Sequence, residues 1–149
     1  MVWKPRLTVA AVIERNKQFL MVEETIDGRS TLNQPAGHVE DGESIIEAVI
    51  RETREETAWH FQPEYLLGIY RWKHDDGDTY IRASFSGTAN GFDNEQPLDP
   101  DIDQARWMTM EELHMAEQQE IFRSPLVMRC ITDFQRGTRF PLDILQDLD

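Results

Sequence analysis

The sequence is poor in cysteine and has no long apolar run, and each absence excludes a class of protein. Cys130 is the only cysteine among 149 residues, so the chain can form neither an internal disulfide nor a zinc site built from several thiolates. We expect Cys130 to be a small buried apolar side chain. No apolar stretch approaches the roughly 18 residues that a membrane-spanning helix requires, and residues 1–5 lack the apolar core of a secretory signal. These absences predict a cytoplasmic protein with no membrane partner.

Basic residues are also scarce relative to acidic ones. There are 15 lysines and arginines against 28 aspartates and glutamates, which gives a formal net charge of −13. This balance disfavours broad binding to nucleic acid, which needs cations to displace counterions from the phosphate backbone. It leaves a small phosphate-bearing ligand open, because such a ligand can bind together with Mg²⁺. Most acidic residues are expected to be solvated surface groups, and the length fits one domain over residues 1–149.

The apolar pattern predicts several strands. Residues 7–13 and 18–23 are rich in β-branched and apolar side chains, and the polar tetrapeptide between them predicts a hairpin turn. Residues 25–34 are loop-like, with Asp27 and Gly28 as a turn signal. Further strands are expected at residues 66–73, 79–88 and 105–108.

A helix is expected over residues 44–57. Ser44 is a good N-cap, and Glu47 three residues later completes a capping box. The apolar stripe that should face the core is formed by Ile46, Val49, Ile50, Thr53 and Thr57. The opposite side of this helix is therefore free to carry polar chemistry.

Two shorter helices are expected near the end of the chain. Thr109 and Glu112 form a second capping box. Ser124 and Pro125 begin the last helix, and Gly137 stands where a glycine would end it. The order of strands, helix, strands and helices predicts an α+β fold.

The first helix carries three glutamates on one side. Residues 51–56 read Arg-Glu-Thr-Arg-Glu-Glu, and at about 100° per residue Glu52, Glu55 and Glu56 fall within roughly 100° of arc. Like charges at this spacing destabilise a helix, whereas a hard cation such as Mg²⁺ or Mn²⁺ relieves the repulsion by binding carboxylate oxygens. Taken alone, the triplet is more often an ordinary solvated acidic face, so the surrounding spacing has to decide.

That spacing forms a long pattern over residues 37–59, which read Gly37-x5-Glu43-x7-Arg51-Glu52-Thr53-x-Glu55-Glu56-x-Ala58-Trp59. It resembles the Nudix box, a loop–helix–loop signature written G-x5-E-x7-R-E-U-x-E-E-x-G-U with U apolar. Every charged position matches. Thr53 departs from the pattern on the buried stripe, where a β-branched side chain can be accommodated. Ala58 replaces the usual glycine at the helix exit, and a positive φ there would strain it by about 1 kcal/mol.

The resemblance extends beyond the box, since two strands precede it and strands and helices follow it. Membership of the Nudix family implies an α/β/α sandwich with a mixed central sheet. Residues 33–38 (Asn-Gln-Pro-Ala-Gly-His) and 123–127 (Arg-Ser-Pro-Leu-Val) further resemble a bacterial phosphatase branch of the family. That likeness implies a Mg²⁺-dependent enzyme, with Mn²⁺ as a possible substitute. Its expected substrates are hydroxymethylpyrimidine pyrophosphate, a thiamine precursor, and nucleoside di- and triphosphates, with release of orthophosphate.

The family pattern, transferred residue by residue, implies the metal ligands Glu52, Glu55 and Glu56 together with the backbone carbonyl of Gly37. Only a small residue lets the backbone approach a metal so closely. The pattern also assigns catalytic support to Glu43 and Arg51, as an ion pair that orients the helix. Their alternative is an exposed pair that contributes under about 1 kcal/mol.

A general base is needed as well. Glu55 is the first candidate, because it could contact both the metal and the attacking water. Other family members take the base from a later loop, for which Glu117 and Glu120 are the candidates in this chain.

Four side chains are candidates for substrate binding. Arg82 could form a bidentate contact with a phosphate, or it could form a surface salt bridge. Trp72, with Tyr70 on the same strand face, could stack on a pyrimidine ring, although strand aromatics more often belong to the core. His38 could contact phosphate or orient its loop, and Arg123 could face anions or pack at the entry of the last helix.

Three functions compete on this evidence. The first is the hydrolase, and the second keeps the enzyme class but releases pyrophosphate from nucleoside triphosphates or from RNA 5′ ends, which the net charge disfavours for RNA. The third is a nucleotide sensor without turnover, although such modules usually lose a glutamate of the box and this chain keeps all of them. The expected partner is a small phosphate compound, and the protein should be a monomer or a small homo-oligomer.

Overall fold

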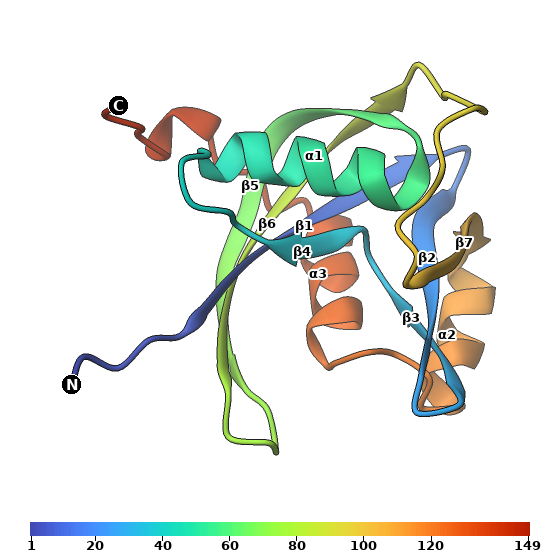
Figure 1. Ribbon diagram of the computed structural model, residues 1–149. Helices are drawn as coiled ribbons and strands as arrows, with labels where there is room; N and C mark the ends of the chain where they lie inside the picture. Colours follow the sequence, from blue (N-terminus) through green and yellow to red (C-terminus); the bar gives the residue numbers. More distant parts are fainter.

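The computed structural model describes all residues 1–149 and contains seven strands and three α-helices (Figure 1). The strands are β1 Arg6–Arg15, β2 Gln18–Ile26, β3 Arg29–Asn33, β4 Ala36–His38, β5 His60–Lys73, β6 Thr79–Asn90 and β7 Ile102–Thr109. The helices are α1 Ile45–Thr57, α2 Met110–Gln118 and α3 Leu126–Gln135, followed by a short 3₁₀ helix at Leu142–Ile144. None of the helices combines the length and apolar character needed to cross a membrane.

The seven strands form one mixed sheet. Its main path runs β3-β2-β1-β6-β5, with β4 paired to β1 and β7 paired to β2. The β1–β6 pair is parallel, and it brings Thr8 opposite Arg82. The other pairings are antiparallel. The expected mixed sheet is therefore confirmed.

Helices cover both faces of the sheet, and a separate apolar core lies under each (Figure 1). Alternation along β1 separates them, because Val9, Ala11 and Ile13 pack with residues of α1, whereas Val12 packs with residues of α2 and α3. Cys130 is fully buried in the second core, as expected. This arrangement confirms the α+β class and the α/β/α sandwich.

The sequence signals of α1 explain where it begins and ends. Both bonds of the predicted capping box are present, since Ser44 Oγ accepts from the Glu47 N–H and the Glu47 side chain accepts from the Ser44 N–H. Thr53 is fully buried, and its hydroxyl donates to the Val49 carbonyl at 2.8 Å. That internal bond explains how threonine replaces an apolar residue there. The helix ends at Ala58, whose φ of 64° is left-handed.

Two expectations about strands were wrong. Residues 25–34 are not wholly loop, because β3 occupies Arg29–Asn33 and forms a hairpin with β2 around the predicted turn. The strand expected at 66–73 begins at His60, six residues earlier. Pro63 hid this start, since proline weakens a strand pattern. A register shift between Pro63 and Tyr65 accommodates it in the ladder.

The later helices follow their signals closely. Thr109 and Glu112 form the predicted capping box of α2. In α3 the first helical residue is Leu126 rather than Pro125, and Ser124 Oγ accepts from the Leu126 N–H at 3.2 Å. Gly137 follows the end of this helix with a φ of 86°.

The left-handed residue at the end of α1 predicts a stabilising substitution. Ala58→Gly removes strain of about 1–2 kcal/mol and loses one buried methyl group, worth about 0.8 kcal/mol. We expect the free energy of urea unfolding to rise by about 0.5 kcal/mol with an unchanged m value. The matched control is Ala48→Gly, a buried position inside the same helix, which should lower it by about 1 kcal/mol or more. A similar decrease in both variants would show that Ala58 is unstrained.

Candidate active site

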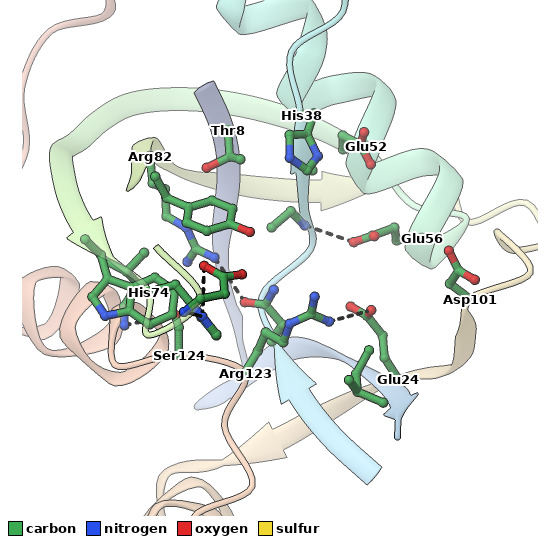
Figure 2. A pocket seen from close by; sticks show the side chains of 18 of the residues that line it. Thr8, Glu24, His38, Glu52, Glu56, His74, Arg82, Asp101, Arg123 and Ser124 are labelled. Carbon is green, nitrogen blue, oxygen red and sulfur yellow. Dashed lines mark hydrogen bonds and ion pairs between the residues drawn. The ribbon is translucent and has the colours of Figure 1, made fainter. Parts of the chain in front are cut away.

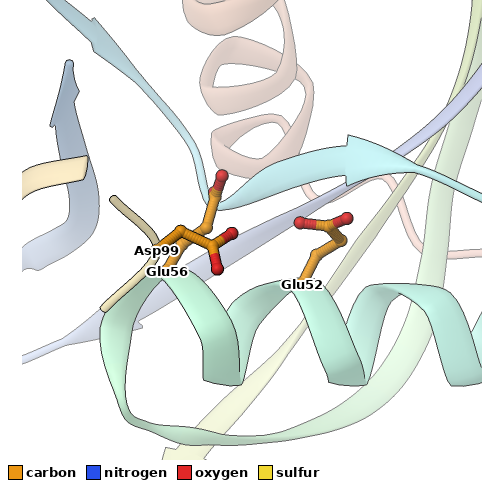
Figure 3. Close-up of side chains that lie close together, drawn as sticks. All are labelled: Glu52, Glu56 and Asp99. Atoms are coloured by element: carbon orange, nitrogen blue, oxygen red, sulfur yellow. The ribbon is translucent and has the colours of Figure 1, made fainter. Parts of the chain in front are cut away.

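Three carboxylates meet at the exit of α1 (Figure 3). Glu52 and Glu56 come from one face of the helix, and Asp99 comes from the loop before β7, with ligand oxygens that lie within 4.8 Å of one another. The Asp99 N–H donates to the Glu55 carbonyl at 2.9 Å, which fixes this loop against the helix. We name Glu52, Glu56 and Asp99 the carboxylate cluster. Sequence reasoning missed Asp99, because its loop carries no periodic signal that places it beside α1.

Burial makes the charged forms of the two glutamates unfavourable. Glu52 and Glu56 are 9% and 8% exposed. Burial raises the pKa of Glu56 to about 9, although the Ala36 N–H bond at 2.9 Å acts in the opposite direction. Burial also raises the pKa of Glu52, and Arg51 partly offsets that shift. A divalent cation would reverse this penalty, and a set of carboxylate oxygens is what Mg²⁺ or Mn²⁺ binds.

The backbone at Gly37 approaches the cluster as the sequence predicted. Gly37 lies on β4, and a Cβ built there would come within 2.1 Å of Glu52 Cδ. No heavy atoms approach that closely without displacement, so only glycine fits between β4 and α1. The close approach places the Gly37 backbone directly beside the Glu52 carboxylate.

Arg51 connects the loop before α1 to the acidic face. It forms a bidentate ion pair with Glu43, with Nη2 donating to Oε1 at 2.7 Å and Nε donating to Oε2 at 3.0 Å. It also donates to the His38 carbonyl at 3.0 Å and to Glu52 at 2.9 Å. The Glu43–Arg51 pair is partly buried rather than fully exposed. Arg51 therefore holds the β4 loop, the helix entry and one carboxylate of the cluster in a fixed relation.

Glu55 lies outside the carboxylate cluster. Its side chain is 36% exposed and pairs with Arg51 Nη1 at 3.2 Å. It follows Glu52 by three residues and directly precedes Glu56, on the more exposed side of the acidic face. This position keeps Glu55 accessible to water.

A cavity of about 630 Å³ opens beside the cluster (Figure 2). Its wall includes Gly37, Glu52 and Glu56, and we name it the main cavity. All four side chains expected to bind substrate also line it, namely His38, Trp72, Arg82 and Arg123. The fold thus brings together residues that lie up to 86 positions apart, from Gly37 to Arg123.

These four side chains differ in their surroundings. Arg82 is 5% exposed and donates to the side-chain oxygens of Gln34 at 3.0 Å and Asn33 at 3.2 Å, so the alternative of a surface salt bridge was wrong. Arg123 is exposed and pairs with Glu24 at 3.2 Å. Burial lowers the pKa of the His38 side chain, and the positive charge of Arg6 lowers it further.

The aromatic residues of β5 divide between core and cavity. Tyr70 belongs to the structural framework, because it packs against the second core and its hydroxyl donates to Asp133 at 2.7 Å. Trp72 instead forms one cavity wall together with Tyr80, whose ring centroid lies 5.7 Å away, and with His74 at 4.9 Å. Tyr80 and His74 had not been singled out in the sequence.

Glu117 and Glu120 line a second hollow next to the main cavity, with Trp72 and Arg123 at the boundary between the two. Both glutamates are exposed. Neither belongs to the carboxylate cluster.

Known proteins resemble this chain in sequence and fold. The NUDIX domain family matches residues 4–130 of the chain. Over 147 residues the chain is 40% identical to Phosphatase NudJ of Escherichia coli K12, a match that covers 99% of this chain and 94% of that protein. A solved NUDIX hydrolase from Nitrosomonas europaea is 50% identical with a TM-score of 0.93, and the match covers 97% of this chain and 98% of that one.

A more distant structure shares the fold alone. The MutT NUDIX hydrolase from Burkholderia pseudomallei matches with a TM-score of 0.69 at 19% identity, over 91% of this chain and 100% of that one. The fold is thus common to proteins whose sequences have diverged widely.

The raised pKa of Glu56 predicts how the stability of the metal-free protein depends on pH. The folded-state pKa of about 9 lies above the ordinary 4.5, so the folded protein binds more protons between those values. The protonated Glu56 side chain stabilises the fold fully below pH 4.5, and this stabilisation is lost as the pH rises through about 9. One proton corresponds to at most about 1.4 kcal/mol per pH unit.

We therefore expect the free energy of urea unfolding in EDTA to decrease from pH 6 to pH 9, and to decrease less steeply in Glu56→Gln. The control is Glu111→Gln, an exposed acid on α2, which should keep the wild-type slope. Equal slopes in wild type and Glu56→Gln would contradict the buried carboxyl as the source.

Proposed function

The chain belongs to the Nudix hydrolase family, and we propose that it is a divalent-metal-dependent phosphohydrolase that cleaves phosphoanhydride bonds of small diphosphates. The observation that supports this most strongly is the buried carboxylate cluster beside a cavity of about 630 Å³. In this proposal residues 37–59 act as the Nudix box of one domain spanning residues 1–149. Activity of the purified protein on small diphosphates tests it directly.

The residues present fit a divalent cation such as Mg²⁺, with Mn²⁺ as a substitute. Glu52 and Glu56 would hold it with the Gly37 carbonyl, and Glu55 would join from the solvent side of the helix. Asp99 adds a carboxylate that the family pattern did not include. When bound, the ion supplies positive charge to phosphate oxygens and makes nearby water more acidic.

The protein groups around this site would position the reactants. Arg51 and Glu43 hold the loop and helix together, which fixes the Gly37 carbonyl relative to Glu52. Glu55 would accept the proton of the attacking water, since it is the accessible carboxylate of the acidic face. Phosphoryl transfer then depends mainly on positioning and on charge stabilisation.

The proposed substrates follow from the relative at 40% identity that is named a phosphatase. We propose hydroxymethylpyrimidine pyrophosphate and nucleoside di- and triphosphates, with release of orthophosphate. Trp72 supplies a flat wall against which a pyrimidine ring could stack. His38 and Arg123 lie on the same cavity and would contact the substrate's polar groups.

The Glu55 assignment predicts a large kinetic effect. Glu55→Gln should lower kcat/KM at least about a hundredfold, which corresponds to about 2.7 kcal/mol of barrier, with most of the loss in kcat. Initial rates of orthophosphate release with Mg²⁺ measure it. Glu111→Gln is the matched control and should keep wild-type rates. If Glu117→Gln or Glu120→Gln shows the loss and Glu55→Gln does not, the base lies in the later loop.

The substrate proposal predicts a product pattern. With Mg²⁺, the protein should release orthophosphate from hydroxymethylpyrimidine pyrophosphate, UDP and CTP, and EDTA should abolish this release because the cluster then lacks its cation. An assay that resolves orthophosphate from pyrophosphate checks both points. Pyrophosphate from triphosphates alone would instead support the sanitising function. Absence of metal-dependent release from the whole panel would favour a sensor that binds without turnover.

A further inference from the structure

Arg82 is the arginine of the main cavity that has no carboxylate partner. The other one, Arg123, pairs with Glu24, whereas the guanidinium of Arg82 donates only to the neutral side-chain amides of Gln34 and Asn33. Arg82 is also 5% exposed. Burying a cation without a counter-charge is costly. The fold therefore retains an uncompensated positive charge on the cavity wall.

The hydrogen bonds of Arg82 are incomplete as well. An arginine side chain has five N–H donors, and two of them are used by Gln34 and Asn33, which leaves three. Its Nε is buried and has no partner. Figure 2 shows the side chain of Arg82 pointing into the cavity. A buried donor without a partner costs free energy, and the unused Nη N–H groups are the donors that Arg82 offers to a ligand.

Two further groups favour an anion in the same place. The Asn33 side-chain oxygen accepts from Arg82, so the amide NH₂ points elsewhere, and Asn33 lines the cavity. Ser124 and Leu126 bring the first turn of α3 to the cavity wall, where the helix dipole favours an anion although the Leu126 N–H is bonded to Ser124 Oγ. Gln34 connects Arg82 to α3, because its side-chain oxygen accepts from Arg82 and its amide donates to the Val127 carbonyl at 2.7 Å.

We propose that Arg82, Asn33 and the N-terminus of α3 form an anion subsite that binds one phosphoryl group of the substrate independently of the metal. It rests on the proposed function for the identity of the substrate. None of the hydrogen bonds of Arg82 reaches the carboxylate cluster. Without a metal, Arg82 is the group of this cavity whose positive charge has no carboxylate partner and attracts an anion. Inorganic phosphate therefore binds the metal-free protein and occupies the place of a substrate phosphoryl group.

The direct test is a titration of the protein with inorganic phosphate in EDTA, followed through the arginine Nε–H resonances in ¹⁵N-correlated NMR spectra. One resonance, identified by its absence in Arg82→Lys, should shift saturably. Arg82→Lys and Arg82→Gln should bind phosphate at least about tenfold more weakly, judged from backbone amide shifts of α3. Arg71→Gln is the matched control, an exposed arginine on the neighbouring strand β5 that does not line the cavity, and it should bind normally.

Absence of any saturable shift in EDTA would overturn the subsite, and so would undiminished phosphate binding in both Arg82 variants. Asn33→Ala keeps the buried cation and tests the second donor, so it remains informative if an Arg82 variant unfolds. It should bind phosphate severalfold more weakly than wild type.

A second experiment tests whether a phosphoryl group of the substrate occupies the subsite during hydrolysis. Inorganic phosphate should inhibit Mg²⁺-dependent hydrolysis competitively, with an inhibition constant at least about tenfold higher in Arg82→Lys. Non-competitive inhibition would overturn the inference. Intact hydrolysis without phosphate binding in EDTA would remove the subsite alone. Phosphate binding without hydrolysis of any substrate would remove the proposed function alone.

Discussion

Burial of Glu52 and Glu56 is the constraint around which the active-site region is built. The two carboxylates lie one helical turn apart, and burial raises the pKa of both, while the charge of Glu52 raises the pKa of Glu56 further. The surrounding groups offset the cost of burial only in part. Arg51 donates to Glu52, the Ala36 N–H donates to Glu56, and Gly37 leaves the space that Glu52 occupies. What is still missing is a positive charge between the carboxylates, which a divalent cation would supply.

The opposite requirement exists elsewhere on the same cavity. Arg82 is a buried cation that lacks an anion, as the carboxylate cluster is a group of anions that lacks a cation. A divalent ion bound together with a phosphorylated compound would satisfy both at once. The cation would be held by the carboxylates and the phosphoryl group by Arg82, so the two opposite charges would meet in one cavity. This complementarity also explains how an acidic protein can accommodate a polyanionic ligand.

Much of this structure could be predicted from the sequence, because local signals were strong where the chemistry is densest. The capping box, the glutamate spacing and Gly37 all lie within 20 residues of each other in one loop–helix segment. Asp99 could not be predicted, since its place beside α1 depends on the path of a long irregular loop. The start of β5 was hidden by Pro63, which only the register shift makes compatible with the ladder. The neutral partners of Arg82 likewise depend on the parallel pairing of β1 with β6.

The choice of those neutral partners is itself informative. Asn33 and Gln34 have the shapes of aspartate and glutamate, and either acid would give Arg82 a buried counter-charge. The chain has 28 acidic residues, yet it presents two amides to this cation. A carboxylate there would relieve the unpaired charge and would also cancel the attraction for an external anion. At position 34 the amide also supplies a donor to the Val127 carbonyl, which a carboxylate could not do. With neutral partners on both sides, the charge of Arg82 stays available to a ligand that brings the negative charge with it.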